Sequence, residues 1–146
     1  MKKRQAFWDA SAIVPICLYQ STSQRARQIS RQTSDVKAVW WGTMAEVRSA
    51  FARALRNSRS NTSEHARALR HLQKISQSWR EIEPLPKVRE LTLQLLDAHP
   101  LRTGDAFQLA AALYWCDEKP RRKVFVCFDD RLAEAANDLG FQVLTV

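Results

Sequence analysis

Four acidic residues stand at comparable places in this 146-residue chain, and their side chains could do chemistry together. Asp9 directly follows the short apolar run 6–8, and Asp129 directly follows the apolar run 124–128. Glu46 and Asp105 lie in the first turns of two predicted helices. Because the carboxyl ends of parallel strands and the starts of the following helices meet at one edge of a sheet, we expect the four carboxylates to lie close together.

Carboxylates gathered at one place repel one another unless a cation lies between them. Oxygen ligands without His or Cys favour hard cations, so the predicted cofactor is Mg²⁺ or Mn²⁺, held by Asp9, Glu46, Asp105 and Asp129. Each acid alone has a simpler explanation. Asp9 and Asp129 could cap helices, and Glu46 and Asp105 could complement helix dipoles. Asp130 is the one local competitor of Asp129.

The elements that must position these residues alternate between strands and helices. The predicted strands cover 6–8, 36–41, 81–85, 124–128 and 141–146. The predicted helices cover 11–19, 21–32, 43–56, 64–79, 86–98, 104–117 and 129–139, with Asn61 and Thr103 as caps and Gly140 as the last stop signal. This alternation predicts an α/β domain with a parallel sheet between helices.

The net charge of +8 is concentrated in the middle of the chain. Residues 48–80 hold eight basic residues and one acidic residue, whereas residues 81–146 hold eight basic and eleven acidic residues. Such a concentration raises the expectation of a polyanionic partner, chiefly nucleic acid, although an arginine-rich solvated helix face would give the same count. The residues concerned are Arg48, Arg53, Arg56, Arg59, Arg67 and Arg70.

Several classes of protein are disfavoured by composition. No apolar run approaches the roughly 18 residues needed to cross a membrane, and Asp9 interrupts the only stretch that resembles a signal peptide. The 3 Gly and 5 Pro residues argue against disordered and all-β chains. The 3 Cys residues form no C-x-x-C pair, which fits a reducing cytoplasm. A receiver domain would need a Lys after a late strand, and Phe128-Asp129-Asp130 offers none.

Four segments carry a resemblance to a known family. They are Phe7–Val14, Thr43–Ala50, Leu101–Ala112 and Val126–Ala133, the last followed by Ala135-Ala136 and Leu139-Gly140. In this order they resemble the four acidic motifs of PIN domains, and within that superfamily those of the VapC-type ribonuclease toxins of prokaryotic toxin–antitoxin pairs. The sequence departs from the family at Cys127, where Thr or Ser is usual, and at Gly104, where Pro or Ala is commoner.

The resemblance implies one PIN-like domain over residues 1–146, which includes a helical hairpin at 57–80. Its expected fold has three layers, α/β/α, around a mainly parallel twisted sheet of about four to five strands. The implied activity is metal-dependent hydrolysis of RNA phosphodiester bonds by an endoribonuclease, with Asp9, Glu46, Asp105 and Asp129 as catalytic residues. The alternative is a non-catalytic PIN-fold module that binds nucleic acid or protein.

The resemblance also implies partners. We expect an RNA substrate, a cognate antitoxin and a second copy of the chain, with no membrane and a cytoplasmic location. Ser11 would hydrogen-bond to a metal-holding carboxylate or a water, or would simply cap the helix after Asp9. The six arginines of the middle segment would bind RNA or a protein partner. Trp40, Trp41 and Trp79 could stack on bases, but packing in the core or an interface is the favoured interpretation.

Overall fold

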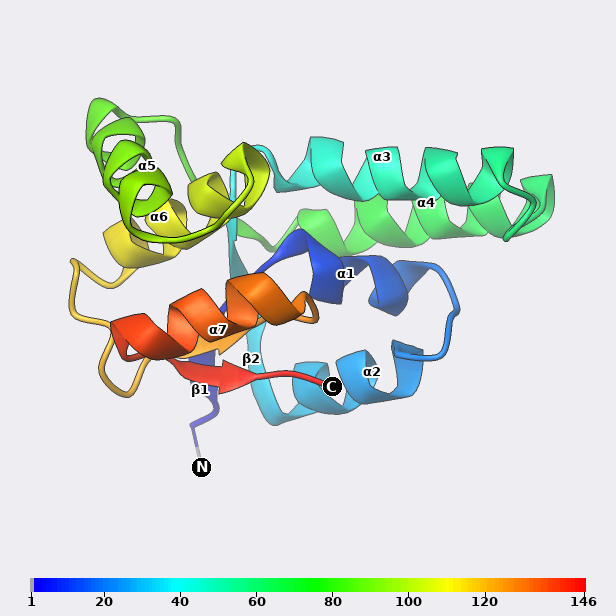
Figure 1. The fold of residues 1–146 in the computed structure, drawn as a ribbon. Helices are drawn as coiled ribbons and strands as arrows, with labels where there is room; N and C mark the ends of the chain where they lie inside the picture. The colour runs from blue at the N-terminus through cyan, green and yellow to red at the C-terminus, as the bar shows by residue number, and fades with distance from the viewer. Residues whose placement is uncertain (1) are drawn as a thin grey trace.

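A parallel sheet of five strands forms the centre of the molecule (Figure 1). The structure is a computed structural model that describes residues 2–146. In chain order its strands are β1 (Arg4–Trp8), β2 (Thr33–Trp40), β3 (Arg80–Ile82), β4 (Val124–Val126) and β5 (Gln142–Leu144). The spatial order is β3-β2-β1-β4-β5, and every neighbouring pair is parallel. The predicted α/β class and strand number are confirmed.

Helices cover both faces of this sheet. Within residues 2–146 they are α1 (Ala10–Cys17), α2 (Ser23–Gln32), α3 (Thr43–Arg56), α4 (Thr62–Ser76), α5 (Pro86–Ala98), α6 (Thr103–Trp115) and α7 (Asp130–Leu139). Alternate strand residues face opposite sides, so Trp8 packs with α1 to α4, whereas its neighbour Phe7 packs with α5 to α7. The molecule therefore has the three layers predicted for a PIN-like fold.

The order of the strands creates a switch point between β1 and β4. The chain lays down β1, β2 and β3 in one direction, then returns to the other side of β1 to add β4 and β5. At the switch, Trp8 at the end of β1 pairs with Val126 at the end of β4. In open parallel sheets, ligands bind in the crevice outside the carboxyl ends of the strands at such a point. By this rule, a ligand would bind at the edge of the sheet next to Asp9.

Element ends differ from the predicted ones by a few residues. β1 begins at Arg4, and β4 ends at Val126, so Cys127 and Phe128 lie in the loop before Asp129 and not in the strand. Thr103 is the first helical residue of α6 and not its cap, because Arg102 takes the cap position. The predicted cap at Asn61 is confirmed as a capping box with Glu64, which starts α4 at Thr62.

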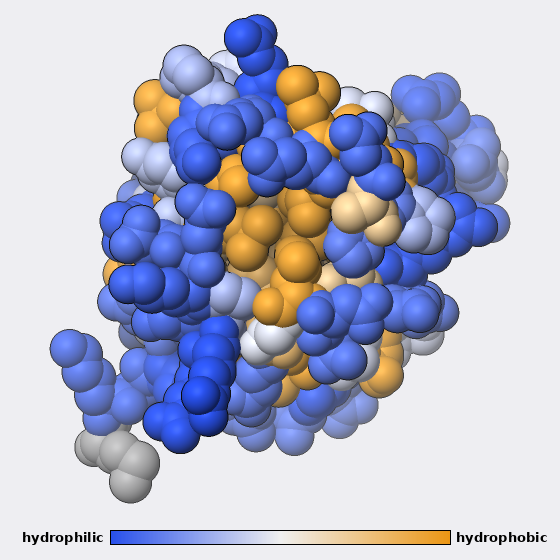
Figure 2. Space-filling view, turned by 60° about the vertical axis from the view of Figure 1, so that its left-hand side comes forward, coloured by the Kyte–Doolittle hydropathy of each residue, from blue (hydrophilic) through white to orange (hydrophobic). Residues whose placement is uncertain are grey.

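Apolar side chains also reach the surface beside the second helical layer. Figure 2, in which the side of α5 and α6 comes forward, shows hydrophobic residues gathered in a hollow at the centre of the face and hydrophilic residues around it. Leu96, Leu101 and Phe107 are among the partly buried residues at the margin of this layer's core. Within residues 2–146, no helix combines the length and the apolar character that a membrane span requires.

Candidate active site

Asp9 and Asp129 stand on neighbouring strand ends at the switch point. Asp9 follows β1 directly and is 3% exposed, and its backbone N–H donates to the Val126 carbonyl at 2.9 Å. Its carboxylate accepts a hydrogen bond from the Ser11 N–H at 3.1 Å, and the Asp129 carboxylate accepts one from the Leu132 N–H at 2.9 Å. Both residues therefore cap helices, as the simpler explanation predicted, and the capping hydrogen bonds hold both carboxylates at the switch point.

Glu46 and Asp105 reach the same edge from two helix starts. Glu46 lies in the first turn of α3, and Asp105 lies in the first turn of α6. The first turns of these two helices lie close together at Gly104. If residue 104 had a Cβ atom, that atom would lie 3.2 Å from Glu46 Oε1. The departure from the family at Gly104 thus leaves space that the Glu46 carboxylate fills.

Mutual repulsion and burial mark the four acids as one group. Burial, with a smaller contribution from the charge of Asp105, raises the pKa of Asp9 to about 6. Burial and the charges of Asp9 and Asp105 raise the pKa of Glu46 to about 7, against a hydrogen bond from Gln108. Burial and the charge of Asp129 raise the pKa of Asp105, which nearby Arg102 opposes. Raised carboxyl pKa values clustered in a crevice are typical of functional sites.

Ser11 joins the two central strand ends. Its hydroxyl donates to Asp9 Oδ2 and accepts a hydrogen bond from the Phe128 N–H at 2.9 Å. Cys127, which is fully buried, lies in the same cluster, with its Sγ 3.7 Å from Asp9 Oδ2 and 3.4 Å from the Asp129 carbonyl oxygen. Burial raises the pKa of this thiol, so it stays protonated and can donate to either oxygen. The loop after β4 is thereby tied to the start of α1.

The donor set fits a hard divalent cation, although the site is not arranged as a closed metal cage. Within residues 2–146, no three His, Cys, Asp or Glu side chains converge as a ready-made metal site. Asp9, Glu46 and Asp129 each accept hydrogen bonds from neighbouring groups instead. Mg²⁺ keeps several of its waters and accepts carboxylates at wider spacing through them. A bound cation would favour the charged form of these carboxyls and so oppose the upward shift of their pKa values.

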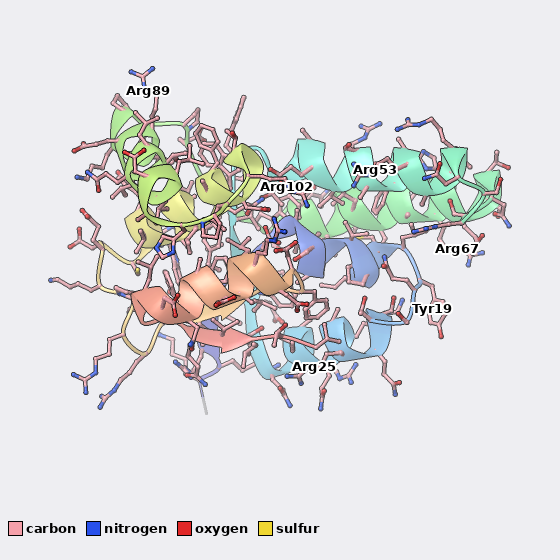
Figure 3. The ribbon with its side chains drawn as sticks, in the orientation of Figure 1. Tyr19, Arg25, Arg53, Arg67, Arg89 and Arg102 are labelled. Atoms are coloured by element: carbon pink, nitrogen blue, oxygen red, sulfur yellow. The ribbon has the colours of Figure 1, made fainter. Side chains whose placement is uncertain are left out.

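Sequence reasoning missed two residues of the site. Gln108 is fully buried one turn after Asp105, and its Nε2 donates to Glu46 Oε2 at 2.8 Å. Arg102 comes just before α6 and is the positive group that acts on Asp105 (Figure 3). A polar residue three positions after Asp105 in an otherwise apolar helix was the available signal for Gln108. Asp130 is exposed, whereas Asp129 is the acid that acts on Asp105.

The six predicted arginines are all exposed, and they lie on α3, on α4 and in the connection between these helices. Arg48 and Arg70 line a hollow of about 410 Å³ between α3 and α4. Arg53 and Arg59 line another, of about 380 Å³, where α3 passes the end of α1. Figure 3 shows Arg53 and Arg67 along the α3–α4 hairpin, with Arg67 farther from Arg102 than Arg53 is. Their predicted role in binding therefore concerns the hairpin surface.

The three tryptophans have different environments. Trp40 is buried and stacks on Phe107 at 5.2 Å between ring centroids, and Trp79 packs at the margin of the core formed with α1 to α4. Trp41 is 55% exposed and lines a largely apolar hollow with Leu85 and other residues. Packing, the favoured interpretation, holds for Trp40 and Trp79.

Solved structures share this fold, although no family model and no curated sequence matches the chain. VapC20 of Mycobacterium tuberculosis, a toxin that cleaves the sarcin–ricin loop, is 14% identical with a TM-score of 0.67 over 90% of this chain and 95% of its own. A toxin–antitoxin complex of Klebsiella pneumoniae is 16% identical, with a TM-score of 0.64 over 87% of this chain and 88% of its own. VapBC2 of Rickettsia felis, bound to promoter DNA, is 12% identical, with a TM-score of 0.59 over 96% of this chain and 97% of its own. The chain thus has the PIN-like fold of VapC-type toxins.

Proposed function

We propose that this protein is a divalent-cation-dependent endoribonuclease and the toxin of a toxin–antitoxin pair. The observation that carries the proposal is the group formed by Asp9, Glu46, Asp105 and Asp129 at the switch point of a PIN-like sheet. Three of these carboxyls have raised pKa values, and the charges of their neighbours contribute to each shift. A purely structural set of helix caps has no need to gather like charges.

The chain's own residues would hold the ion and prepare the site. Asp9, Glu46, Asp105 and Asp129 would bind Mg²⁺ or Mn²⁺ directly or through water. When bound, such an ion neutralises phosphate charge and lowers the pKa of water. Ser11 keeps the Asp9 carboxylate in one orientation, and Gln108 does the same for Glu46. Arg102 supplies a positive charge beside Asp105 that is suited to an approaching phosphate.

The similar structures also support the proposed partners. One of them is a toxin–antitoxin complex, and another is VapBC2 bound to a DNA fragment from its promoter. By analogy we infer a cognate antitoxin for this chain. A homodimer remains a prediction from the resemblance of the sequence alone. Since the proposed substrate is cellular RNA, the proposal places the protein in the cytoplasm. The exposed arginines of the α3–α4 hairpin are the surface available to such partners.

The test is cleavage of labelled RNA by the purified protein with Mg²⁺, with Mn²⁺ or with EDTA. Wild type should cleave only with a divalent ion, and Asp105→Asn should lose cleavage while it keeps the circular dichroism spectrum of the wild type. The matched control is Asp130→Asn, which alters an exposed acid beside the site and should keep activity. Cleavage by a pure Asp105→Asn preparation, or no cleavage by wild type with either ion, would exclude this function and favour the non-catalytic module.

A further inference from the structure

Tyr19 projects from the molecule at a place that packing does not explain. It lies in the connection between α1 and α2, and 77% of its surface is exposed, more than for any other large hydrophobic residue in the part of the chain described. Figure 3 shows it at the edge of the molecule between α2 and the α3–α4 hairpin, far from the α5 side. Because this aromatic ring is exposed to solvent, a ligand can contact it.

Arginines stand on both sides of this ring. One hollow, of about 370 Å³, is lined by Tyr19, Gln24, Arg27 and Arg31. The last three lie three and four positions apart, and therefore on one face of α2. The second hollow, of about 380 Å³, contains Tyr19 together with Arg53, Arg59 and other residues from α1 and α3. Tyr19 is thus the shared wall of two basic hollows.

These arginines have no acidic partners in the fold. Neither hollow is lined by an Asp or a Glu residue. Between residues 2 and 146, both ion pairs of the structure involve Lys87 on α5 and none of the four arginines. By contrast, Arg25 on the same helix is bound to the Thr145 carbonyl and to Gln28. Of the four guanidinium groups, that of Arg53 donates one hydrogen bond, to the Ser49 hydroxyl at 2.9 Å. None of the four is in an ion pair, so each keeps N–H groups that can bind an anion.

A flat ring between free guanidinium groups fits an unpaired nucleic-acid strand. Guanidinium groups bind phosphates, and an exposed ring stacks on any base that is not already in a helix. A duplex keeps its bases stacked inside and could use the arginines but not the ring. An acidic protein segment would pair with the arginines, yet its carboxylates would offer no flat ring to stack on Tyr19.

The position of this surface relative to the four acids would let one continuous nucleic-acid strand contact both. α1 begins next to Asp9 and ends just before Tyr19, and its eight residues span about 12 Å. α3 packs on α1 and carries Glu46 in its first turn and Arg53 about two turns later. The basic surface therefore lies about the length of one short helix, α1, away from Asp9.

We propose that Tyr19, Arg27, Arg31, Arg53 and Arg59 form a subsite for single-stranded RNA, in which the Tyr19 ring stacks on a base a few nucleotides from the bond that is cut. The position of that bond rests on the ribonuclease function proposed above. The binding itself does not, since it requires neither the four acids nor a metal ion.

Binding of a fluorescent single-stranded RNA of about 12 nucleotides, within the usual range of such sites, tests the subsite. Anisotropy is measured in EDTA, so that metal-dependent cleavage cannot interfere. Tyr19→Ala should weaken binding by about 5- to 150-fold, as for loss of one stacked base. Tyr19→Phe keeps the ring and should bind as wild type does. The matched control is Tyr114→Ala, which removes the only other tyrosine, itself 40% exposed on α6.

Salt dependence tests the arginines separately. If Arg27 and Arg53 each contact a phosphate, the double variant Arg27→Gln/Arg53→Gln should reduce the slope of log affinity against log salt by about 1.4. Arg89→Gln, which changes an exposed arginine on α5, should leave the slope unchanged. An RNA duplex should depend on the arginines but not on Tyr19.

Two results would overturn the subsite. One is equal RNA affinity of Tyr19→Ala and Tyr114→Ala. The other is a loss of poly-glutamate binding by Tyr19→Ala with RNA binding intact, which would assign the surface to an acidic protein. Failure of the ribonuclease proposal looks different: wild type would not cleave, while Tyr19→Ala would still lose affinity for RNA.

Discussion

The side-chain amide of Gln108 donates a hydrogen bond to the Glu46 carboxylate at 2.8 Å and another to the Thr43 hydroxyl at 3.0 Å. The amide thus connects α6 to the first turn of α3 beside the Glu46 carboxylate. Because it donates to the charged form of Glu46, it holds the pKa of that carboxyl lower than burial alone would set it. Gln108 is a positioning residue that tunes one of the four acids.

Replacing this amide should change the pH dependence of the proposed ribonuclease. Gln108→Met keeps the volume but removes both hydrogen bonds, so we expect the pKa of Glu46 to rise above about 7 and the acid limb of the pH–rate profile to move to higher pH. The free energy of unfolding should fall by about 1–3 kcal/mol, since buried polar groups lose a partner.

The control for Gln108→Met is Leu109→Met, which exchanges the next buried side chain of α6 without touching a hydrogen bond. It should lower stability only slightly and leave the acid limb in place. If the acid limbs of the two variants lay at the same pH, Gln108 would have no influence on the titration of Glu46.

Without divalent ions, the acidic cluster should make the protein less stable as the pH rises. The folded-state pKa of Asp9 is about 6, against an ordinary value of 3.8, so the folded protein binds its proton more tightly than the unfolded chain. The stability from this group is fully present below about pH 4 and is lost as the pH rises to about 6. It amounts to about 3 kcal/mol at most, because each pKa unit corresponds to about 1.4 kcal/mol. Glu46 extends the decline to about pH 7.

Thermal melting in EDTA at pH 5 and pH 8 measures this effect, and Mg²⁺ or Mn²⁺ is then added at each pH. The ion should raise the melting temperature at pH 8, where the carboxylates are ionised, and have little effect at pH 5. Asp105→Asn should weaken both the pH dependence and the response to metal, whereas Asp130→Asn should change neither. An equal metal response at both pH values would contradict the prediction.

Local sequence patterns were sufficient to locate the strands before Asp9 and Asp129 and the start of α4. The apolar runs before Asp9 and Asp129 and the Asn61–Glu64 cap are signals carried by neighbouring residues, and each corresponds to an element of the structure. The rule that parallel strand ends share an edge then predicted that the acids gather. Nothing beyond the chain's own spacing was needed for that step.

The contacts between elements could not be predicted in the same way. Gln108 meets Glu46 across 62 positions of sequence, and Phe128 meets Ser11 across 117, so no local period encodes either contact. The exposure of Tyr19 could not be predicted either, because the apolar stretch 11–18 before it predicted a helix that includes Tyr19. Tertiary packing ends α1 at Cys17 and leaves Tyr19 outside it.

All three cysteines should be unreactive in the native protein. Cys17, Cys116 and Cys127 are buried free thiols, and burial raises the pKa of each, to about 12 for Cys17. Since the thiolate is the reactive form, an aromatic disulfide reagent at pH 8 should titrate no thiol before unfolding and three in denaturant. A thiol that reacts within the mixing time in native buffer would contradict this burial.

Cys127→Ser should move the acid limb of RNA cleavage to lower pH. The Cys127 sulfur lies 3.7 Å from Asp9 Oδ2, and a hydroxyl there is a stronger hydrogen-bond donor than a thiol. A donor to the charged form lowers the pKa of Asp9 from about 6, so the carboxylate would be ionised over a wider pH range. Stability should stay within about 1.5 kcal/mol of wild type, the usual worth of one hydrogen bond.

The comparison that makes this result specific is Cys116→Ser. That thiol donates to the Leu113 carbonyl at 3.6 Å, at the end of α6 away from the acids, so its replacement should alter stability without moving the pH–rate profile. Melting in EDTA at pH 8 gives a second measure, since a lower pKa of Asp9 should raise the melting temperature of Cys127→Ser relative to Cys116→Ser. Identical pH profiles for the two variants would mean that the buried group at position 127 does not act on Asp9.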